Sequence, residues 1–250
     1  MTTGLQVDAT LDLPAVLLVG GKGTRLRSVV SSAPKPMAAV GQQSFLELLV
    51  RQLRRQGIRR LVMCSGYLAE QIEEKFGDGS QWDVAISYSR EQQPMGTAGA
   101  VMLAKESLAG AGDFLVLNGD SFLEVDFPRL FEFHRAKNAI VSMAIAPVEN
   151  AGRYGTVQIA TDGRVTGFVE KTGASGPGLI NAGVYIFSAR VFEHIPQGPS
   201  SLEKDIFPFV LDRGVYGLEQ AGLFIDIGTP EDYARAQALC DQLCNAALRK

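Results

Sequence analysis

Glycines and cations gather directly after an apolar run near the start of the chain, in the segment AVLLVGGKGTRLRSVVSSAPKPMAAV, residues 15–40. The glycines are Gly20, Gly21 and Gly23. Arg25 follows them, and Lys35 stands between two prolines. Glycine permits backbone conformations that expose N–H groups, and such groups beside guanidinium and ammonium groups bind phosphate. A plain turn between a strand and a helix explains the glycines but not the cations, so the segment predicts an anion-binding loop.

The register of this loop excludes two common nucleotide-binding sequences. The dinucleotide-binding pattern G-x-G-x-x-G fails because the sixth residue from Gly21 is Leu26. The triphosphate-binding pattern G-x-x-x-x-G-K-[ST] fails because Gly23 follows Lys22, and because Val16 stands where the first glycine belongs. An NAD-dependent oxidoreductase is therefore disfavoured.

Two aspartates, far apart in the sequence, follow short apolar runs. Asp120 lies in LNGDS and Asp226 lies in FIDIG. An aspartate in such a place commonly caps a turn or a helix. A pair of carboxylates is also what Mg²⁺ takes from a protein when phosphate oxygens complete its coordination. The residues alone leave both interpretations open.

The glycine loop and the following PKPM segment resemble the sugar-1-phosphate nucleotidyltransferases, whose signature is L-x-G-G-x-G-T-R-L followed by P-K and an apolar residue. Matching segments continue along most of the chain: QPMGTAGA (93–100), LNGDS (117–121), RYGTV (153–157), FVEK (168–171), GLINAGVY (178–185) and FIDIGTPEDY (224–233). The resemblance implies an enzyme in which an oxygen of a sugar 1-phosphate attacks the α-phosphorus of a nucleoside triphosphate. Pyrophosphate leaves, and such a reaction depends on positioning and charge neutralisation.

The resemblance also implies a role for each matched residue. Arg25 would clamp the leaving pyrophosphate, and Lys35 would meet the α-phosphate or the sugar phosphate. Asp120 and Asp226 would converge on Mg²⁺, the expected cofactor. The expected nucleotide-binding residues are Leu18, Gly20, Gly21, Gly23, Thr24, Pro94, Gly96 and Thr97. The expected sugar-phosphate-binding residues are Gly155, Glu170, Lys171 and Asn181.

Some of these assignments have ordinary alternatives. Pro94 and Gly96 would read the nucleobase with their backbone, and Gly96 would leave space for its ring, but they also suit a plain loop before a helix. Lys35 on its own is explained as a solvated surface lysine. Glu170 and Lys171 are also explained as an exposed pair in a strand.

The substrates are narrowed further by three segments, GTRLRSVV, RYGTV and GLINAG. These are most similar to family members that transfer a guanylyl group from GTP to D-glycero-α-D-manno-heptose 1-phosphate. Members that act on mannose 1-phosphate are nearly as similar, and uridylyl or thymidylyl transfer is a further alternative. A different class, a non-catalytic regulatory protein that binds nucleotide sugars on the same fold, is opposed by the presence of all the charged residues named above.

Apolar strands and helical patterns alternate through the first half of the chain. Strands are expected at 15–19, 60–65, 83–89 and 113–120, with helices at 44–57, 67–77 and 96–107. Ser44 and Glu47 form a capping box at the first helix, and Gly57 ends it. This alternation is typical of a parallel sheet covered by helices on both faces.

The second half is richer in strands, which are expected at 139–147, 154–160, 164–171 and 179–188, with a hairpin turn at 161–163. A helical segment should start near residue 200 with Ser200 and Glu203 as a capping box, and a last helix should span 230–247 after Thr229. The predicted fold is α/β, with a doubly wound, mostly parallel mixed sheet of the Rossmann-like nucleotidyltransferase type. A tail (1–12) would precede one catalytic domain (13–250), whose nucleotide-binding part spans about 13–125 and whose sugar-phosphate-binding part spans about 126–228.

Composition and charge restrict the partners. The chain has 250 residues, 46% of them hydrophobic, and a formal net charge of −3, which disfavours binding to nucleic acid by bulk charge. No apolar run reaches the roughly 20 residues of a membrane span, and the start of the chain lacks signal-peptide features. Three cysteines in such a chain suit a reducing cytoplasm, and Cys240 and Cys244 are expected to pack rather than to bind metal. We expect a cytoplasmic enzyme with no membrane or nucleic-acid partner, and a homodimer is one expected assembly.

Overall fold

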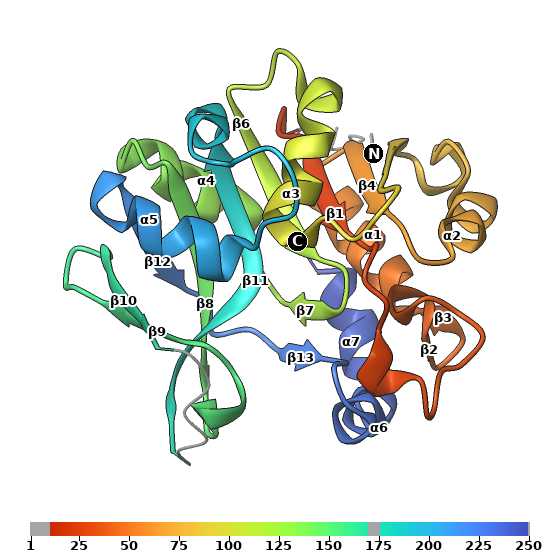
Figure 1. Cartoon of the computed structure of the whole chain (residues 1–250). Coiled ribbons are helices and arrows are strands. Elements are labelled where there is room, and N and C mark those ends of the chain that lie inside the picture. The colour runs from red at the N-terminus through yellow and green to blue at the C-terminus, as the bar shows by residue number, and fades with distance from the viewer. Residues whose placement is uncertain (1–10, 170–175, 250) are drawn as a thin grey trace, which may run out of the picture.

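The computed structural model describes residues 11–169 and 176–249. Its strands are β1 Ala15–Leu18, β2 Ala39–Val40, β3 Gln43–Ser44, β4 Arg60–Ser65, β5 Ala85–Arg90, β6 Asp113–Asn118, β7 Ser121–Leu123, β8 Val141–Val148, β9 Thr156–Ile159, β10 Val165–Val169, β11 Gly178–Ser188, β12 Val215–Glu219 and β13 Phe224–Asp226 (Figure 1). Its α-helices are α1 Phe45–Arg55, α2 Ala69–Phe76, α3 Gly96–Leu103, α4 Phe127–Ala136, α5 Phe207–Val210, α6 Pro230–Ala238 and α7 Cys240–Ala247. Short 3-10 helices are η1 Thr24–Leu26, η2 Lys35–Met37, η3 Ser80–Trp82, η4 Ala104–Leu108, η5 Ala151–Arg153, η6 Ala189–Glu193 and η8 Leu211–Arg213, and η7 Leu202–Ile206 is a π-helical turn.

A mixed sheet forms the centre of the molecule, in the order β10-β9-β11-β6-β1-β4-β5, with β8 pairing to β11 and β12 pairing to β8. β6, β1, β4 and β5 are parallel, whereas β11 runs antiparallel to β6. Two small antiparallel ladders, β7 with β13 and β2 with β3, lie outside this sheet. The predicted fold class, a mostly parallel sheet that becomes mixed in its second half, is confirmed.

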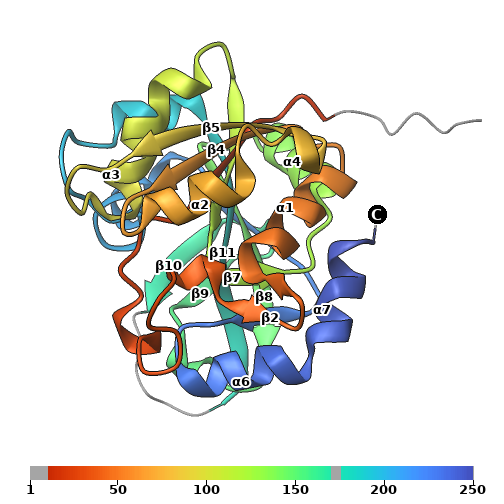
Figure 2. The same ribbon diagram turned by 90° about the vertical axis from the view of Figure 1, so that its right-hand side faces the viewer.

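Apolar residues on successive positions of each strand point to opposite faces of the sheet and enter two separate cores. In β1, Leu17 joins the core that packs under α1, α2, α4 and α7, whereas Val16 joins the core under α3 and α5. The C-terminal helix α7 lies beside α1 (Figure 2), so the end of the chain covers the same face as the first helix. None of the helices in 11–169 and 176–249 has the length and apolar character of a membrane span.

Most of the expected elements are present, with shifted ends. The capping box of α1 is confirmed, because the Glu47 carboxylate accepts a hydrogen bond from the Ser44 backbone N–H at 2.7 Å. The hairpin at 161–163 is confirmed by the antiparallel pairing of β9 with β10. α2 begins only after Leu68, which adopts a left-handed conformation, and α3 ends at Leu103, where the chain tightens into η4.

The helical segment near residue 200 and the last helix are present, but two details predicted for them are wrong. The N-cap of η7 is Ser201, whose hydroxyl accepts a hydrogen bond from the Lys204 N–H, and Ser200 lies one residue outside it. The predicted helix over 230–247 is two helices, because Leu239 leaves helical geometry between α6 and α7. The N-cap of α6 is Thr229, as predicted.

One buried histidine is expected to make the stability of the fold depend on pH. His134 in α4 is 2% exposed, and its Nδ1 lies 3.0 Å from the Ser142 hydroxyl. Burial lowers the pKa of His134 below its ordinary value of 6.5, and the nearby Asp113 carboxylate only partly opposes this. The unfolded chain therefore binds a proton more readily than the folded chain, so the free energy of unfolding should fall as the pH drops below about 6.5.

Urea denaturation at about pH 7.5 and about pH 5.5 measures this loss. The variant His134→Asn should show a smaller difference between the two pH values than the natural chain. Equal differences in the two proteins would contradict the assignment to His134.

Candidate active site

An open cavity of about 700 Å³ lies at the carboxyl ends of the parallel strands. Leu18 of β1 is in register with Cys64 of β4 and Asn118 of β6, and all three line the cavity. Open α/β sheets bind ligands at this edge, where the loops leaving the strands diverge.

Residues predicted from separate motifs meet in this cavity. Those that line it are Leu18, Gly20, Gly21, Gly23, Thr24, Arg25, Lys35, Pro94, Gly96, Thr97 and Asp120. Gly155, Asn181 and Asp226 are described but are not among its lining residues. Glu170 and Lys171 lie outside the described residues, as does most of the predicted N-terminal tail.

The glycine loop folds back onto the PKPM segment. Gly23 adopts a φ of +56°, and a Cβ added there would stand 2.8 Å from the Cβ of Lys35. Only glycine combines this backbone conformation with so close an approach. The loop thereby brings the exposed side chain of Arg25 to the same cavity as Lys35, whose side chain is only 10% exposed.

The two aspartates are brought together by the small β7–β13 ladder, which pairs Ser121 with Asp226. The Ser121 hydroxyl lies 3.1 Å from Oδ2 of Asp226 and 3.4 Å from Oδ1 of Asp120. Lys35 Nζ donates to Oδ2 of Asp120 at 2.6 Å, and the Gly228 N–H donates to Oδ1 of Asp226 at 2.6 Å. The two carboxylates therefore lie on either side of one hydroxyl, with one ammonium group beside them.

Electrostatics at this pair favour an added cation. Burial raises the pKa of the Asp226 carboxyl, and the nearby Asp120 raises it further, while Lys35 and the hydrogen bonds oppose both effects. Two neighbouring carboxylates suit Mg²⁺, which takes one or two protein carboxylates and completes its coordination with phosphate oxygens and water. No group of three or more His, Cys, Asp and Glu residues is placed to hold a metal within the described ranges, so such an ion would rely on bound phosphates.

Glu91 and Ser121 are among the residues of the site that sequence reasoning missed. The carboxylate of Glu91 accepts a hydrogen bond from the Met95 N–H at 2.6 Å and fills the position that a side chain on Gly20 would take. This carboxylate thus lies between the loop before α3 and the glycine loop. Ser121, whose hydroxyl lies near both aspartates, is another. Its position directly after Asp120 was the available signal, but its pairing with Asp226 is a tertiary contact.

The loop before α3 is held by a segment from the second half of the chain. The Ser200 carbonyl accepts hydrogen bonds from the N–H groups of Ala98 (3.0 Å) and Gly99 (3.3 Å). The Thr97 hydroxyl donates to Glu203 at 3.0 Å. Gly96 has a φ of +70°, and its missing side chain would overlap the Ser200 carbonyl. The positive φ and the nearby Ser200 carbonyl are sufficient to explain the need for glycine at this position.

The variant Gly96→Ala tests this contact. We expect it to lower the free energy of unfolding by about 1–3 kcal/mol, because a left-handed alanine is strained and meets a backbone carbonyl. Urea denaturation measures the change. The control Gly112→Ala has open space around its added methyl group and should stay within about 1 kcal/mol of the natural chain. Equal stabilities for the two variants would contradict the prediction.

Two predicted sugar-phosphate residues, Gly155 and Asn181, lie in contact with each other. The Asn181 N–H donates to the Gly155 carbonyl at 3.2 Å. The Asn181 side chain donates to the Tyr185 hydroxyl at 2.8 Å and accepts from the Gly183 N–H at 3.1 Å, at an irregularity in the pairing of β11 with β8. Bulges of this kind commonly turn strands beside functional sites.

The chain belongs to the nucleotidyl transferase family, whose model matches residues 14–242. It is 40% identical over 227 residues to the D-glycero-alpha-D-manno-heptose 1-phosphate guanylyltransferase of Aneurinibacillus thermoaerophilus, with 90% of this chain and 97% of that protein covered. It is 38% identical over 234 residues to the mannose-1-phosphate guanylyltransferase of Mycobacterium tuberculosis, which covers 92% of this chain but only 65% of that protein.

The fold is also that of solved structures. The crystal structure of HddC from Yersinia pseudotuberculosis complexed with GMP-PN superposes with a TM-score of 0.80 at 33% identity, over 90% of this chain and 98% of that one. The resemblance to the sugar-1-phosphate nucleotidyltransferases, noted from the sequence motifs, is confirmed.

Proposed function

We propose that this protein transfers a guanylyl group from GTP to a sugar 1-phosphate, with D-glycero-α-D-manno-heptose 1-phosphate as the preferred acceptor. The observation that carries the transfer reaction is the meeting of Arg25, Lys35 and Asp120 in one cavity, with Asp226 held beside them through Ser121. The choice of GTP and of a manno-configured sugar is supported by the names of the two relatives.

In this proposal each charged side chain has one task. The Gly20–Gly23 loop and Arg25 hold the β- and γ-phosphates, which leave as pyrophosphate. Lys35 balances the charge that develops on the α-phosphate while the sugar phosphate oxygen attacks. Asp120 and Asp226 hold Mg²⁺, which would neutralise phosphate charge when bound.

The remaining side chains position the two substrates. The loop 92–97, fixed by Glu91 and Ser200, forms the nucleobase side of the cavity. Gly155, Asn181, Glu170 and Lys171 are proposed for the sugar-phosphate side. The side-chain amide of Asn181 is already hydrogen-bonded within β11. Asn181 would therefore contribute mainly by holding the backbone of β11 in place.

A matrix of the common nucleoside triphosphates against several sugar 1-phosphates, scored by pyrophosphate release with and without Mg²⁺, tests the proposal. GTP with the heptose 1-phosphate should give the highest kcat/KM, and removal of Mg²⁺ should abolish turnover. A higher kcat/KM with mannose 1-phosphate would show that mannose 1-phosphate is the acceptor instead. A higher kcat/KM with UTP or dTTP would show that GTP is not the preferred donor. Binding without turnover in every combination would contradict the proposed enzymatic activity and would favour a non-catalytic nucleotide-sugar-binding protein.

A further inference from the structure

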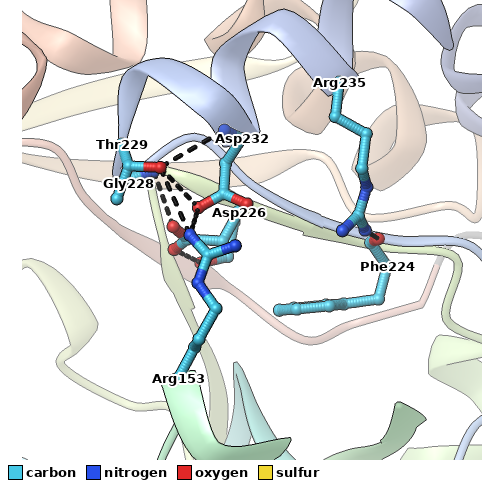
Figure 3. Close-up of polar contacts among 8 residues, drawn as sticks. Arg153, Phe224, Asp226, Gly228, Thr229, Asp232 and Arg235 are labelled. Atoms are coloured by element: carbon cyan, nitrogen blue, oxygen red, sulfur yellow. Dashed lines mark hydrogen bonds and ion pairs between the residues drawn. The ribbon is translucent and has the colours of Figure 1, made fainter. Parts of the chain in front are cut away.

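Arg153, at the end of η5, links the proposed sugar-phosphate side of the site to the segment that carries Asp226. One nitrogen of its guanidinium donates to Oδ2 of Asp232 at 2.6 Å and to the Thr229 hydroxyl at 3.3 Å. Figure 3 shows Arg153 reaching from its loop to Thr229 and Asp232, with Asp226 and Gly228 beside them. The contact joins residues nearly eighty positions apart, so the sequence alone does not indicate it.

The pair is asymmetric in its burial. The Arg153 side chain is 47% exposed, whereas the Asp232 side chain is 7% exposed. Asp232 also accepts from the Thr229 hydroxyl at 2.9 Å, and its own N–H donates to that hydroxyl at 3.3 Å as the helix cap of α6. A buried carboxylate is costly unless it is paired, so Asp232 favours the conformation in which Arg153 reaches it.

Thr229 and Asp226 are three residues apart, and the two residues between them are held by hydrogen bonds from their backbone N–H groups. Gly228, between them, donates its N–H to Asp226 and lines the cavity, and Ile227 donates its N–H to the Asp120 carbonyl at 3.0 Å. A displacement of the α6 cap would therefore be transmitted to the carboxylate of Asp226.

The two residues after Arg153, Tyr154 and Gly155, contact β13 and β11. The Tyr154 ring meets Phe224 of β13 edge to face, with 5.5 Å between ring centroids, and Asp232 and Asp226 add to burial in raising the pKa of Tyr154. The Gly155 carbonyl accepts the Asn181 N–H of β11. Three successive residues thus join α6, β13 and β11.

We propose that Arg153 is a positioning residue, which sets the sugar-phosphate strip 153–155 against the Asp226 segment through its ion pair with Asp232. This role rests on the proposed function of the site. It predicts a selective defect, because the glycine loop and the loop 92–97 are held by other contacts, from Lys35, Glu91 and Ser200.

The test compares Arg153→Gln, Arg153→Lys and Asp232→Asn with a control, Arg54→Gln, which removes an arginine from an exposed ion pair with Asp83. Arg153→Gln should raise the KM for the sugar 1-phosphate about tenfold and leave the KM for GTP within about twofold. Arg153→Lys should recover most of the loss, because it keeps a cation beside Asp232. Asp232→Asn should show the same selective change, and the double variant should be no worse than the poorer single variant.

Calorimetric binding of the sugar 1-phosphate to the protein with Mg²⁺ and a non-hydrolysable GTP analogue separates this inference from the proposed function. Weaker binding by Arg153→Gln than by the natural chain supports the positioning role even if no turnover is found. Natural sugar-phosphate binding and kinetics in Arg153→Gln would overturn it, as would additive losses in the double variant. Equal losses for both substrates, with a lowered Tm, would also overturn it, because they indicate a general structural role.

Discussion

Asp226→Asn should lower kcat by about 10²–10³-fold while the folded protein becomes no less stable. The loss of activity is expected because the variant removes one of the two carboxylates proposed to hold Mg²⁺. The stability is expected because the charged form of Asp226 is disfavoured by burial and by Asp120, and these effects raise its pKa. A neutral side chain at this position relieves both, so Tm should be unchanged or higher.

Pyrophosphate release at saturating substrates and a thermal melt measure the two effects. Asp241→Asn, on the exposed side of α7, is the matched control and should keep natural activity. Near-natural kcat in Asp226→Asn would contradict the metal role. A large fall in Tm would show that Asp226 instead stabilises the ladder between β7 and β13.

Lys35→Met should also lower kcat by about 10²–10³-fold, but with the opposite effect on stability. Lys35 is the ammonium group that contacts Asp120 and that lowers the pKa of Asp226. Without it two neighbouring carboxylates lose their nearest positive charge, so Tm should fall at neutral pH and part of the loss should be recovered with added Mg²⁺.

The same two assays measure this variant, with Lys204→Met on the exposed side of η7 as control. Recovery of Tm in the double variant Lys35→Met with Asp226→Asn would show that the charges at this pair cause the change. A Tm unaffected by Lys35→Met would contradict the proposed balance of charge.

Sequence reasoning predicted the fold well where the signal is local. The apolar strands at 60–65 and 113–120 and the capping box at Ser44 and Glu47 depend on neighbours in the chain, and all are present. It failed at Ser200, because the carbonyl of that residue serves the distant helix α3 and the helix of its own segment starts one residue later. The short strands β7 and β13 were also missed, since a three-residue strand with two apolar residues shows no recognisable period.

In the candidate site, too, the residues recognisable from local motifs were predicted, and those that act through distant contacts were not. The glycine loop, Arg25, Lys35 and the two aspartates could be assigned from motifs, because phosphate and metal chemistry restricts the residue types. Glu91, Ser121 and Arg153 could not, since each acts by contacting a residue far along the chain. Their types are common in exposed loops, so only the tertiary structure distinguishes them.

The Ser200 carbonyl, bound to the N–H groups of Ala98 and Gly99, makes the late part of the chain a structural component of the early part. β11 likewise covers the edge of β6, and β13 pairs with β7. A growing chain of which only residues 1–125 had left the ribosome would present β6 as an open, apolar edge strand, and the N–H groups in the first turn of α3 would lack the Ser200 carbonyl. The contacts that β11 and Ser200 make with β6 and α3 can therefore form only after the later part of the chain has been synthesised.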